Sequence, residues 1–572
     1  MSDKVKRKRR WILRDEPDSL PVCEAVSGLH PVLCRLLGQR GVTDSQTTAN
    51  FLEPRLRDLS DPFELPEMEK AVARIFQAID EGEEICVYGD YDVDGITSIT
   101  IMTAVLRAYG GKVRQFIPIR SSEGYGLSDV ALERCLGEGP KPSLMITVDC
   151  GTVSHEPIRY LAGQGIDVLV VDHHERGPAG RPDCVALVNP KFETTPYGYL
   201  CAAGVVFKLA HALLKTRERA HFDLKDVLDL VAVATIADIV PLVGENRLLV
   251  RHGLKRLSKT RNRGLRALME VTGLNGFTTS SDVGFRLGPR INAAGRMDRP
   301  EEALQALLSD DAAQARGLAS RLDTYNRQRQ KTELQILAEA EAMLVERFDV
   351  EREPVIVVGS RDWHPGVVGI VASRLMRKYH RPVFVVAIDP EKGIGKGSGR
   401  SIEGVSLVKA IHATSHHLIA GGGHHMAAGI SLMEEQLESF REAFGTFVRE
   451  TTSASDLEPR LHLDAVLPLA DVDLDFLHQY ERLQPFGSGN PVPVFMARKV
   501  WPAEPPRRLK NNHLKLWLRQ GTVERDAMYF GGGEYELPEA PWDIAFTIDR
   551  NCFRGNTTCQ MMIRDIRPAG EI

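Results

Sequence analysis

The chain alternates short apolar runs with longer stretches in which apolar residues recur every three or four positions. We predict buried strands at 83–90, 111–118, 142–150, 166–174 and 184–190. The intervening and following stretches have the spacing of amphipathic helices and lie at 96–110, 128–137, 154–164 and 199–215. Because the strands are continuously apolar and alternate with helices, they predict a parallel sheet covered on both faces.

The pattern beyond this sheet predicts two further bodies. Residues 301–347 contain a single glycine and no proline, which indicates long connecting helices. Apolar runs at 353–360 and 381–389 flank a helical pattern and begin a second α/β unit. The last stretch of the chain, from about residue 460, holds short strand-like runs that favour a small barrel or sandwich.

Composition narrows the class of protein. A length of 572 residues suggests three to four domains, and no apolar run approaches the roughly 18 residues that a membrane-spanning helix needs. The nine cysteines are scattered without a C-x-x-C pair, which argues against a disulfide framework and a zinc ribbon. We therefore expect a cytoplasmic protein that does not associate with membranes.

Charge is distributed unevenly along the chain. The net charge is −5, but residues 360–400 carry a local charge of +5 and residues 497–519 one of +6. Basic islands in an acidic chain are typical of a groove that binds phosphates. Two solvated surfaces would give the same count, so charge alone leaves both interpretations open.

Groups able to bind metal ions follow three of the predicted strands. The first strand is followed by Asp90, Asp92 and Asp94, the third by Asp149, and the fourth by Asp172, His173 and His174. The carboxyl ends of parallel strands meet at one edge of a sheet, so these groups should converge. Asp238 ends the helical run 229–238. This run is so apolar that a carboxylate at its end calls for a functional explanation.

So many carboxylates in one place would repel one another unless cations neutralise them. Aspartates with histidine suit Mn²⁺ or Mg²⁺, and a pair of such ions about 3.5–4 Å apart is the usual arrangement for displacement at phosphorus. Helix capping is the alternative for any single aspartate at a strand–helix junction. Helix capping does not explain well why four such sites should converge.

Several motifs resemble those of a known superfamily. The segments GDYDVDGITS (89–98), TVDCG (147–151), VDHH (171–174) and ATIAD (234–238) resemble, in order, the four motifs of the DHH phosphoesterase superfamily. The resemblance covers roughly residues 80–560 and is to its bacterial 5′→3′ single-strand-specific DNA exonucleases. It continues through EGYGL (123–127), NPK (189–191), LGPRINAAGRM (287–297), WHPGVVGIVASRL (363–375), GSGRS (397–401), GGHHMAAG (422–429) and QPFGSGNPVPVF (484–495).

The resemblance implies a site for two ions, Mn²⁺ or Mg²⁺. Metal binding would fall to Asp92, Asp94, Asp149, His173 and Asp238, with Asp149 bridging the ions and Asp90 assisting. His174 would face the scissile phosphate, so Asp149, His174, Asp92 and Asp94 form the implied catalytic set. Many relatives have His where Tyr88 stands, and ligation of the first ion is expected to differ here.

Nucleic-acid binding is implied for a second set of residues. Ser398, Arg400, Arg290 and Arg120 would hold the 5′-terminal phosphate and its neighbours, and the motifs add Arg296 and His424. Glycines around Arg400 allow backbone N–H groups to approach a phosphate, and its guanidinium can hold one through two parallel hydrogen bonds. Trp501, Trp517 and Phe530 lie in or near the +6 island, where we expect at least Trp517 to belong to the core instead.

The implied fold class is α/β, with a parallel-sheet DHH domain, a second α/β DHH-associated domain and a C-terminal OB-like barrel. The expected boundaries are 1–75 for an N-terminal extension, 76–300 for the DHH domain, 301–350 for connecting helices, 351–450 for the DHH-associated nucleic-acid-binding domain and 455–572 for the OB-like domain.

The implied activity is hydrolysis of single-stranded DNA from the 5′ end by two-metal-ion catalysis, releasing 5′-mononucleotides in DNA repair and recombination. A monomer working beside a single-strand-binding protein and a RecQ-type helicase is expected. The alternative is a DHH phosphodiesterase acting on short oligonucleotides or cyclic dinucleotides.

Overall fold

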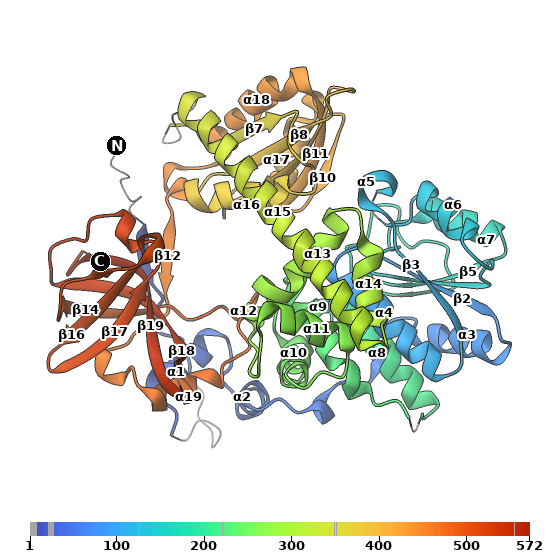
Figure 1. The fold of residues 1–572 in the computed structure, drawn as a ribbon, viewed down its shortest axis with the longest axis horizontal. Coiled ribbons are helices and arrows are strands. Elements are labelled where there is room, and N and C mark those ends of the chain that lie inside the picture. Colours follow the sequence, from blue (N-terminus) through green and yellow to red (C-terminus); the bar gives the residue numbers. More distant parts are fainter. Residues whose placement is uncertain are drawn as a thin grey trace. The chain divides into compact units, whose positions relative to one another are not determined.

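The structure is a computed structural model that describes residues 9–20, 28–124, 126–219, 221–347, 349, 352–553 and 555–571. The chain divides into two compact units (Figure 1). The smaller unit consists of Met1–Ile12 and Tyr325–His462, and the larger one of Leu13–Thr324 and Leu463–Ile572. Tyr125, in the middle of the EGYGL motif, lies outside the described residues.

The larger unit contains the predicted parallel sheet. Its strand order is β3-β2-β4-β5-β6, and every neighbouring pair is parallel. The strands are β2 (Glu84–Gly89), β3 (Lys112–Phe116), β4 (Leu144–Val148), β5 (Asp167–Val171) and β6 (Ala186–Val188). All five correspond to predicted apolar runs. The four strands other than the edge strand β3 are almost wholly buried, which leaves no polar face to obscure the pattern.

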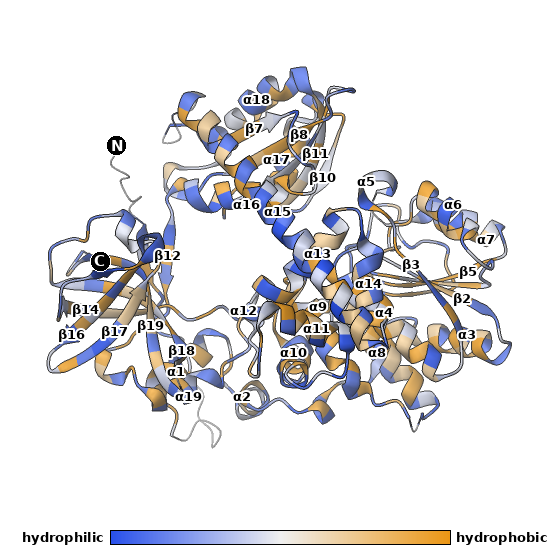
Figure 2. Cartoon of the chain, in the orientation of Figure 1, coloured by the Kyte–Doolittle hydropathy of each residue, from blue (hydrophilic) through white to orange (hydrophobic). Residues whose placement is uncertain are grey.

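Helices cover both faces of this sheet. Side chains such as Cys86, Met145 and Val168 form one core with α6 (Asp129–Gly137) and α7 (His155–Gly163). The other face is covered by α4 (Val93–Ala108), which packs on β2, β3 and α8 (Ala202–Thr216), while α3 (Met68–Asp80) packs on α8 and β6. Strands and covering helices are apolar where they meet (Figure 2).

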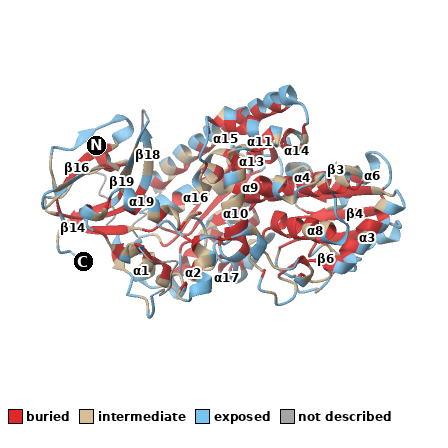
Figure 3. Ribbon diagram, turned by 90° about the horizontal axis from the view of Figure 1, so that it is seen from below, coloured by how far each residue is buried: buried red, intermediate tan, exposed pale blue. Residues whose placement is uncertain are grey.

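A group of helices follows the sheet in the chain. It comprises α9 (Leu228–Ala237), α10 (Gly244–Leu257), α11 (Arg263–Thr272), α12 (Ser280–Asp282), a π-helix at Val283–Leu287, α13 (Gly288–Arg296) and α14 (Pro300–Leu308). Every residue from Leu228 to Thr235 is buried, so α9 is a central helix (Figure 3). The 36-residue α15 (Ala312–Arg347) contains the division between the two units.

The smaller unit is built on a mixed five-stranded sheet with the order β10-β11-β9-β8-β7. β7 and β8 are parallel and the remaining pairs are antiparallel. The strands are β7 (Ile356–Ser360), β8 (Val383–Ile388), β9 (Ile394–Arg400), β10 (Ala420–Gly423) and β11 (Ala427–Met433), with helices α16 (Val368–Tyr379), α17 (Leu407–Ala413) and α18 (Leu437–Thr451). Separate apolar cores lie on the two faces of the sheet.

The C-terminal residues form a closed barrel within the larger unit. Strands β14, β18, β19, β17 and β16 pair in that order, and β16 pairs back with β14 to close the ring. The bounds are β13 (Ala465–Val466), β14 (Phe495–Pro502), β15 (Arg507–Arg508), β16 (Leu514–Gln520), β17 (Val523–Tyr529), β18 (Trp542–Phe553) and β19 (Asn556–Pro568), with helix α19 (Leu474–Glu481). In a separate two-stranded sheet, β1 (Arg10–Leu13) pairs with β12 (Arg460–Leu463).

Two features of the barrel differ from simple expectation. Helices α1 (Pro31–Gln39) and α2 (Ser45–Leu52), from the start of the chain, contribute to the barrel's own apolar core through leucines such as Leu36. Trp517 was expected in the core but is half-buried on the outer face, since Leu516 and Leu518 take the inward positions of β16. In the described part of the chain, every helix is too short or too polar to cross a membrane.

Candidate active site

The acidic residues converge at the carboxyl edge of the parallel sheet. Asp90 follows β2, and Asp92 is the N-cap of α4, where its side chain accepts a hydrogen bond from Gly95 N. A Cβ on Gly95 would lie 2.3 Å from the carbonyl oxygen of Asp90, so this turn requires glycine. Asp149 follows β4 with a φ of 61°.

One imidazole lies at the centre of the cluster. Nε2 of His173 is 3.3 Å from Asp149 Oδ1 and 3.7 Å from the Oδ2 atoms of Asp94 and Asp238. Asp238 reaches this position as the C-cap of α9. The site is thus built from residues that follow β2, β4, β5 and α9, which are far apart in the sequence. The positions of these residues after the four elements predicted that they would converge.

Three sets of side chains in the described residues have ligand atoms within 4.8 Å of one another. Asp149 and His173 each belong to two of the sets, and bridging of two ions by Asp149 stays a prediction. The sets are Asp90 with Asp92 and Asp149; Asp149 with His173 and His174; and Asp94 with His173 and Asp238.

Crowding of carboxylates perturbs their protonation. Burial, reinforced by neighbouring carboxylates, raises the pKa of Asp94 to about 7 and that of Asp238 to about 8. The same causes raise the pKa of Asp90 and Asp149 well above the usual value. Burial and the charge of His174 lower the pKa of His173 to about 3, so its ring is neutral and able to bind a cation.

The cluster fits hard divalent cations. Asp90 Oδ1 and Asp238 Oδ2 are buried and make no hydrogen bond, which is costly unless a ligand occupies them. The three sets of candidate ligands among the described residues consist of carboxylates, joined by imidazoles in two of the sets, and include no thiolate. That donor set suits Mn²⁺ or Mg²⁺.

A second aspartate orients the other histidine. Asp172 is buried and accepts hydrogen bonds from His174 Nδ1 at 2.7 Å, from His173 N at 2.8 Å and from Thr152 N at 3.1 Å. Burial opposes ionisation of Asp172, but its bond to His174 outweighs that effect and lowers its pKa. Burial likewise opposes charge on His174, yet the bond to Asp172 raises the pKa of His174 to about 9.

The Tyr88 side chain makes its contacts within the protein. Its hydroxyl donates to the carbonyl oxygen of Gly126 at 2.9 Å, and its ring stacks on Phe116. The hydroxyl is therefore engaged within the protein, and the expected difference in metal ligation from relatives with histidine stays a prediction.

Two of the predicted basic residues, Arg120 and Arg296, lie near Tyr91 in the segment Asp90–Asp94. The guanidinium of Arg120 lies over the Tyr91 ring, 5.6 Å from its centroid. Arg296 is half-buried in the last turn of α13, which packs so closely on this segment that a Cβ on Gly295 would lie 2.8 Å from Tyr91 O.

Arg290 is engaged differently from the predicted role. Its Nε and Nη2 atoms lie 2.9 and 2.8 Å from Asp323 Oδ1, and Nη1 donates to Arg286 O. These contacts join α13 to α15 and use the three nitrogens that could hold a phosphate. A phosphate-binding role for Arg290 stays a prediction.

In the smaller unit, Ser398 and Arg400 form a pair on β9. Arg400 Nη1 donates to Ser398 Oγ at 3.2 Å and to Gly399 O at 2.6 Å. A Cβ on Gly369, in the first turn of α16, would lie 2.8 Å from Ser398 Oγ. A helix N-terminus beside an arginine favours an anion. His424 follows β10 and is exposed.

Comparison with known proteins assigns the family. Family models match in chain order: the DHH family N-terminal domain over residues 84–235, the DHHA1 domain over 352–450 and the RecJ OB domain over 463–565. The chain is 37% identical to the single-stranded-DNA-specific exonuclease RecJ of Bacillus subtilis, over 98% of this chain and 71% of that one. It is 33% identical to RecJ of Escherichia coli, over 99% and 100% of the two chains. The chain belongs to the RecJ family.

A solved structure agrees with this assignment. The crystal structure of RecJ from Thermus thermophilus in complex with Mn²⁺ matches with a TM-score of 0.82 and 31% identity, over 98% of this chain and 80% of that one. The predicted RecJ-type fold, with a parallel-sheet DHH domain, a DHH-associated domain and an OB barrel, is confirmed.

Sequence reasoning missed two residues of this RecJ-family site. Asp172 was noted but given no role, although an aspartate directly after a buried strand is a signal. Asn292 accepts a hydrogen bond from Val93 N at 3.1 Å and so ties α13 to the start of α4. Nothing in the sequence reveals that contact, since 199 residues separate the partners.

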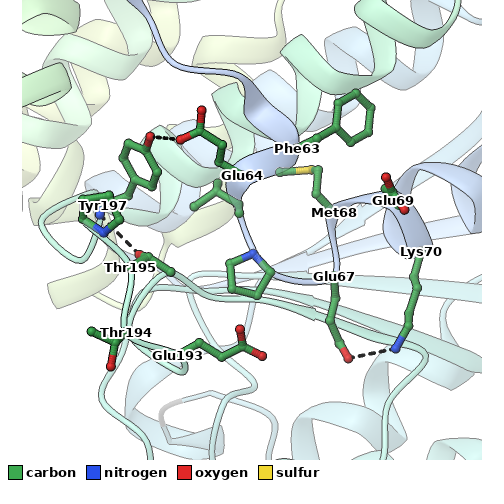
Figure 4. Close-up of a pocket in the computed structure, with 13 residues that line it drawn as sticks. Phe63, Glu64, Glu67, Met68, Glu69, Lys70, Glu193, Thr194, Thr195 and Tyr197 are labelled. Carbon is green, nitrogen blue, oxygen red and sulfur yellow. Dashed lines mark hydrogen bonds and ion pairs between the residues drawn. The ribbon is translucent and has the colours of Figure 1, made fainter.

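A separate cavity of about 500 Å³ shares no residue with the acidic cluster (Figure 4). It is lined by residues 63–70 and 193–197. In it, Tyr197 donates to Glu64, and Lys70 pairs with Glu67. None of the predicted site residues of this RecJ-family chain lines it.

Proposed function

We propose that this chain is a metal-dependent, single-strand-specific DNA exonuclease that hydrolyses phosphodiester bonds. The observation that carries the proposal is the convergence of Asp90, Asp92, Asp94, Asp149 and Asp238 around His173 in a RecJ-family fold. Relatives that align with nearly all of this chain are named single-stranded-DNA-specific exonucleases.

Two ions, Mn²⁺ or Mg²⁺, would be held in this cluster. Asp90, Asp92 and Asp149 would hold one, and Asp94, His173 and Asp238 the other, with Asp149 placed to bridge them. Bound ions of this kind lower the pKa of water and neutralise charge on the attacking and leaving oxygens. Structures of RecJ with Mn²⁺ and with Mg²⁺ support this choice of metal.

The chain's own groups supply orientation and charge. Asp172 holds His174 through Nδ1 and keeps its imidazole positively charged at neutral pH, so the ring can donate to a phosphate oxygen. His174 is therefore the proposed donor to the scissile phosphate, in a catalytic set with Asp92, Asp94 and Asp149.

Recognition of the DNA end is proposed for the arginine-rich positions. Ser398 and Arg400 at the N-terminus of α16 would bind the 5′-terminal phosphate, and His424, Arg120, Arg290 and Arg296 its neighbours. The proposed 5′→3′ polarity, with release of 5′-mononucleotides, comes from the family resemblance.

The outer face of the barrel is proposed to hold the single strand. Trp501 and Phe530 are about half exposed, and Lys515 Nζ lies 4.9 Å from the Trp517 ring centroid. Basic residues beside exposed aromatic rings bind single strands by phosphate contacts and base stacking.

The wider setting is proposed from the family alone. The protein would act in DNA repair and recombination beside a single-strand-binding protein and a RecQ-type helicase. It would be a cytoplasmic monomer with the domain boundaries 76–300, 351–450 and 455–572. The small-substrate alternative is not favoured, because the RecJ OB domain is present.

The test uses single-stranded DNA labelled at either end, with Mn²⁺ or Mg²⁺ and a blunt duplex as control. We expect mononucleotides from the 5′ end, no degradation in chelator and none of the duplex. Asp149→Ala should abolish cleavage while leaving the fold intact. Hydrolysis of dinucleotides without degradation of long strands would overturn the proposal.

A further inference from the structure

The motif QPFGSGNP, residues 484–491, has no part in the chemistry described so far. It lies in the C-terminal part of the chain between α19 and β14, yet it contacts the segment that follows Asp238. Leu242 N donates to Ser488 O at 2.7 Å. We call residues 484–491 the clamp loop and residues 238–243 the Asp238 turn.

The contact between the two segments is close. A Cβ on Gly487 would lie 2.7 Å from Leu242 Cδ1, and one on Gly489 would lie 3.1 Å from Pro241 Cβ. Gly489 also has a φ of +72°, a conformation that side chains disfavour. The clamp loop therefore needs glycine at both positions in order to reach the turn.

The clamp loop is itself held firmly. Asn490 is 1% exposed, and its Nδ2 donates to the carbonyl oxygens of Leu483 and Pro485. Its Oδ1 accepts from Arg40 Nε at 2.8 Å, and Gly487 and Asn490 exchange backbone hydrogen bonds. The loop is thus a rigid surface for the turn to rest on.

Helix α10 completes the support. Arg247, which is 3% exposed, donates to the carbonyl oxygens of Leu483 and Arg482, and Arg251 donates to those of Arg482 and Gln484. Asn246 on the same helix donates to Pro241 O. One helix thereby holds both the start of the clamp loop and the Asp238 turn.

The turn needs such support because it carries a metal-ligand candidate on an unusual backbone. Ile239, the residue after Asp238, has a φ of +61° and a side chain that is 73% exposed, so its own packing contributes little. Asp238 Oδ2 makes no hydrogen bond that would fix its carboxylate. Helix α9 fixes the backbone of Asp238 on one side, because Asp238 N donates to Ala234 O, and the turn fixes it on the other side.

We propose that the clamp loop is a positioning element that sets the Asp238 carboxylate for metal binding, so that the C-terminal part of the chain completes the metal site. This inference rests on the proposed function only in taking Asp238 as a metal ligand. The competing explanation is that the loop merely fastens the barrel to the rest of the larger unit.

Mn²⁺ binding to the full-length protein, without DNA, separates these explanations. The EPR signal of unbound aqueous Mn²⁺ gives the dissociation constant, and thermal melting in chelator gives the stability of each variant. The variants are Gly489→Ala and Gly487→Ala. The matched control is Gly165→Ala, since Gly165 has a φ of +71° and a Cβ added there would meet no neighbour within 4 Å.

We expect both clamp-loop variants to raise the Mn²⁺ dissociation constant by about 10- to 100-fold, the usual cost of losing support for a metal ligand. Gly165→Ala should bind Mn²⁺ like the wild type. Exonuclease activity of the clamp-loop variants should fall at limiting Mn²⁺ and recover at saturating Mn²⁺.

Wild-type Mn²⁺ affinity in either folded clamp-loop variant overturns the proposal, and so does an equal loss of affinity in Gly165→Ala. If Gly489→Ala does not fold, the result for Gly487→Ala decides the question. Gly487 does not have a positive φ, so alanine there causes no backbone strain. A wild-type protein that binds Mn²⁺ but leaves single-stranded DNA intact contradicts the proposed exonuclease function but not the positioning role of the clamp loop.

Discussion

Asp94 and Asp238 face the same imidazole but are held in different ways. Both oxygens of Asp94 accept backbone hydrogen bonds, from Ala202 N at 2.7 Å and Ala203 N at 2.8 Å. Asp238 Oδ2 has no such donor. Asp94 is therefore part of the fold at the start of α8 as well as a ligand candidate, whereas Asp238 is free to serve a cation.

This difference makes Asp238→Asn an informative change. Burial and neighbouring carboxylates raise the pKa of Asp238 to about 8, so on folding of the metal-free protein this carboxyl group must take up a proton or carry a charge that its neighbours repel. Asparagine avoids both costs, so we expect the metal-free variant to melt at a higher temperature than wild type. Mn²⁺ should stabilise the wild type through preferential binding to the folded state and stabilise the variant much less. Thermal melts with Mn²⁺ and with chelator check both effects. A lower melting temperature of the variant in chelator would contradict the repulsion argument.

The raised pKa values of Asp94 and Asp238 predict how stability depends on pH. Aspartates in the unfolded chain ionise near pH 3.9, but the pKa values of about 7 and 8 mean that the folded protein keeps these protons longer. The folded state binds more protons between about pH 4 and 8, so metal-free stability falls as pH rises through that window.

Bound cations replace those protons, so the melting temperatures in Mn²⁺ and in chelator should diverge between pH 5.5 and 8. Asp238→Asn should narrow the divergence, since one of the two titrating groups is gone. If the difference between the melting temperatures in Mn²⁺ and in chelator stays constant across this pH range, in wild type and variant alike, the two aspartates do not titrate as described.

At the scale of elements, α9 and α10 form the pair that places Asp238. They approach so closely that a Cβ on Gly253 of α10 would lie 2.2 Å from Leu228 O of α9. Residues of both helices share a small apolar core. The crossing therefore depends on the absence of a side chain at one position.

We predict that Gly253→Ala forces the two helices apart and lowers the free energy of unfolding by about 1–3 kcal/mol, the usual cost of overpacking. Gly317→Ala is the control, because Gly317 lies exposed in α15 with nothing near a Cβ. There, alanine should stabilise the helix by about 0.5–1 kcal/mol. Urea unfolding of both variants measures these changes, and a loss of stability in Gly317→Ala would undermine the steric argument.

The sequence predicted elements better than the contacts between them. Apolar strands identified the sheet, and the aspartates after β2 and β4 identified its active edge, because both signals are local. Arg290 shows the limit: its motif indicated phosphate binding, but nothing in the motif revealed its contact with Asp323, which lies 33 residues away. Pairing between distant polar side chains leaves no periodic trace in the sequence.

At the scale of the whole molecule, the N-terminal helices are the least predictable part. Residues 1–75 were expected to form an extension, and α1 and α2 have an ordinary amphipathic pattern. In the structure their leucines lie in one core with Phe476, Phe495 and Phe546, more than 400 residues away in the chain. Amphipathic spacing shows that a helix has an apolar face but does not identify what covers it.

This shared core predicts how the chain tolerates truncation. Leu33, Leu36 and Leu37 are completely buried, and burial of each stabilises the fold by about 1.5–3 kcal/mol. A chain ending at residue 454 leaves these side chains without their partners and should aggregate. A chain spanning 55–454 lacks both halves of the core and keeps the parallel sheet with its acidic edge, so it should stay monomeric. Size-exclusion chromatography and binding of a hydrophobic dye compare the two, and equal behaviour would mean that α1 and α2 do not depend on the barrel.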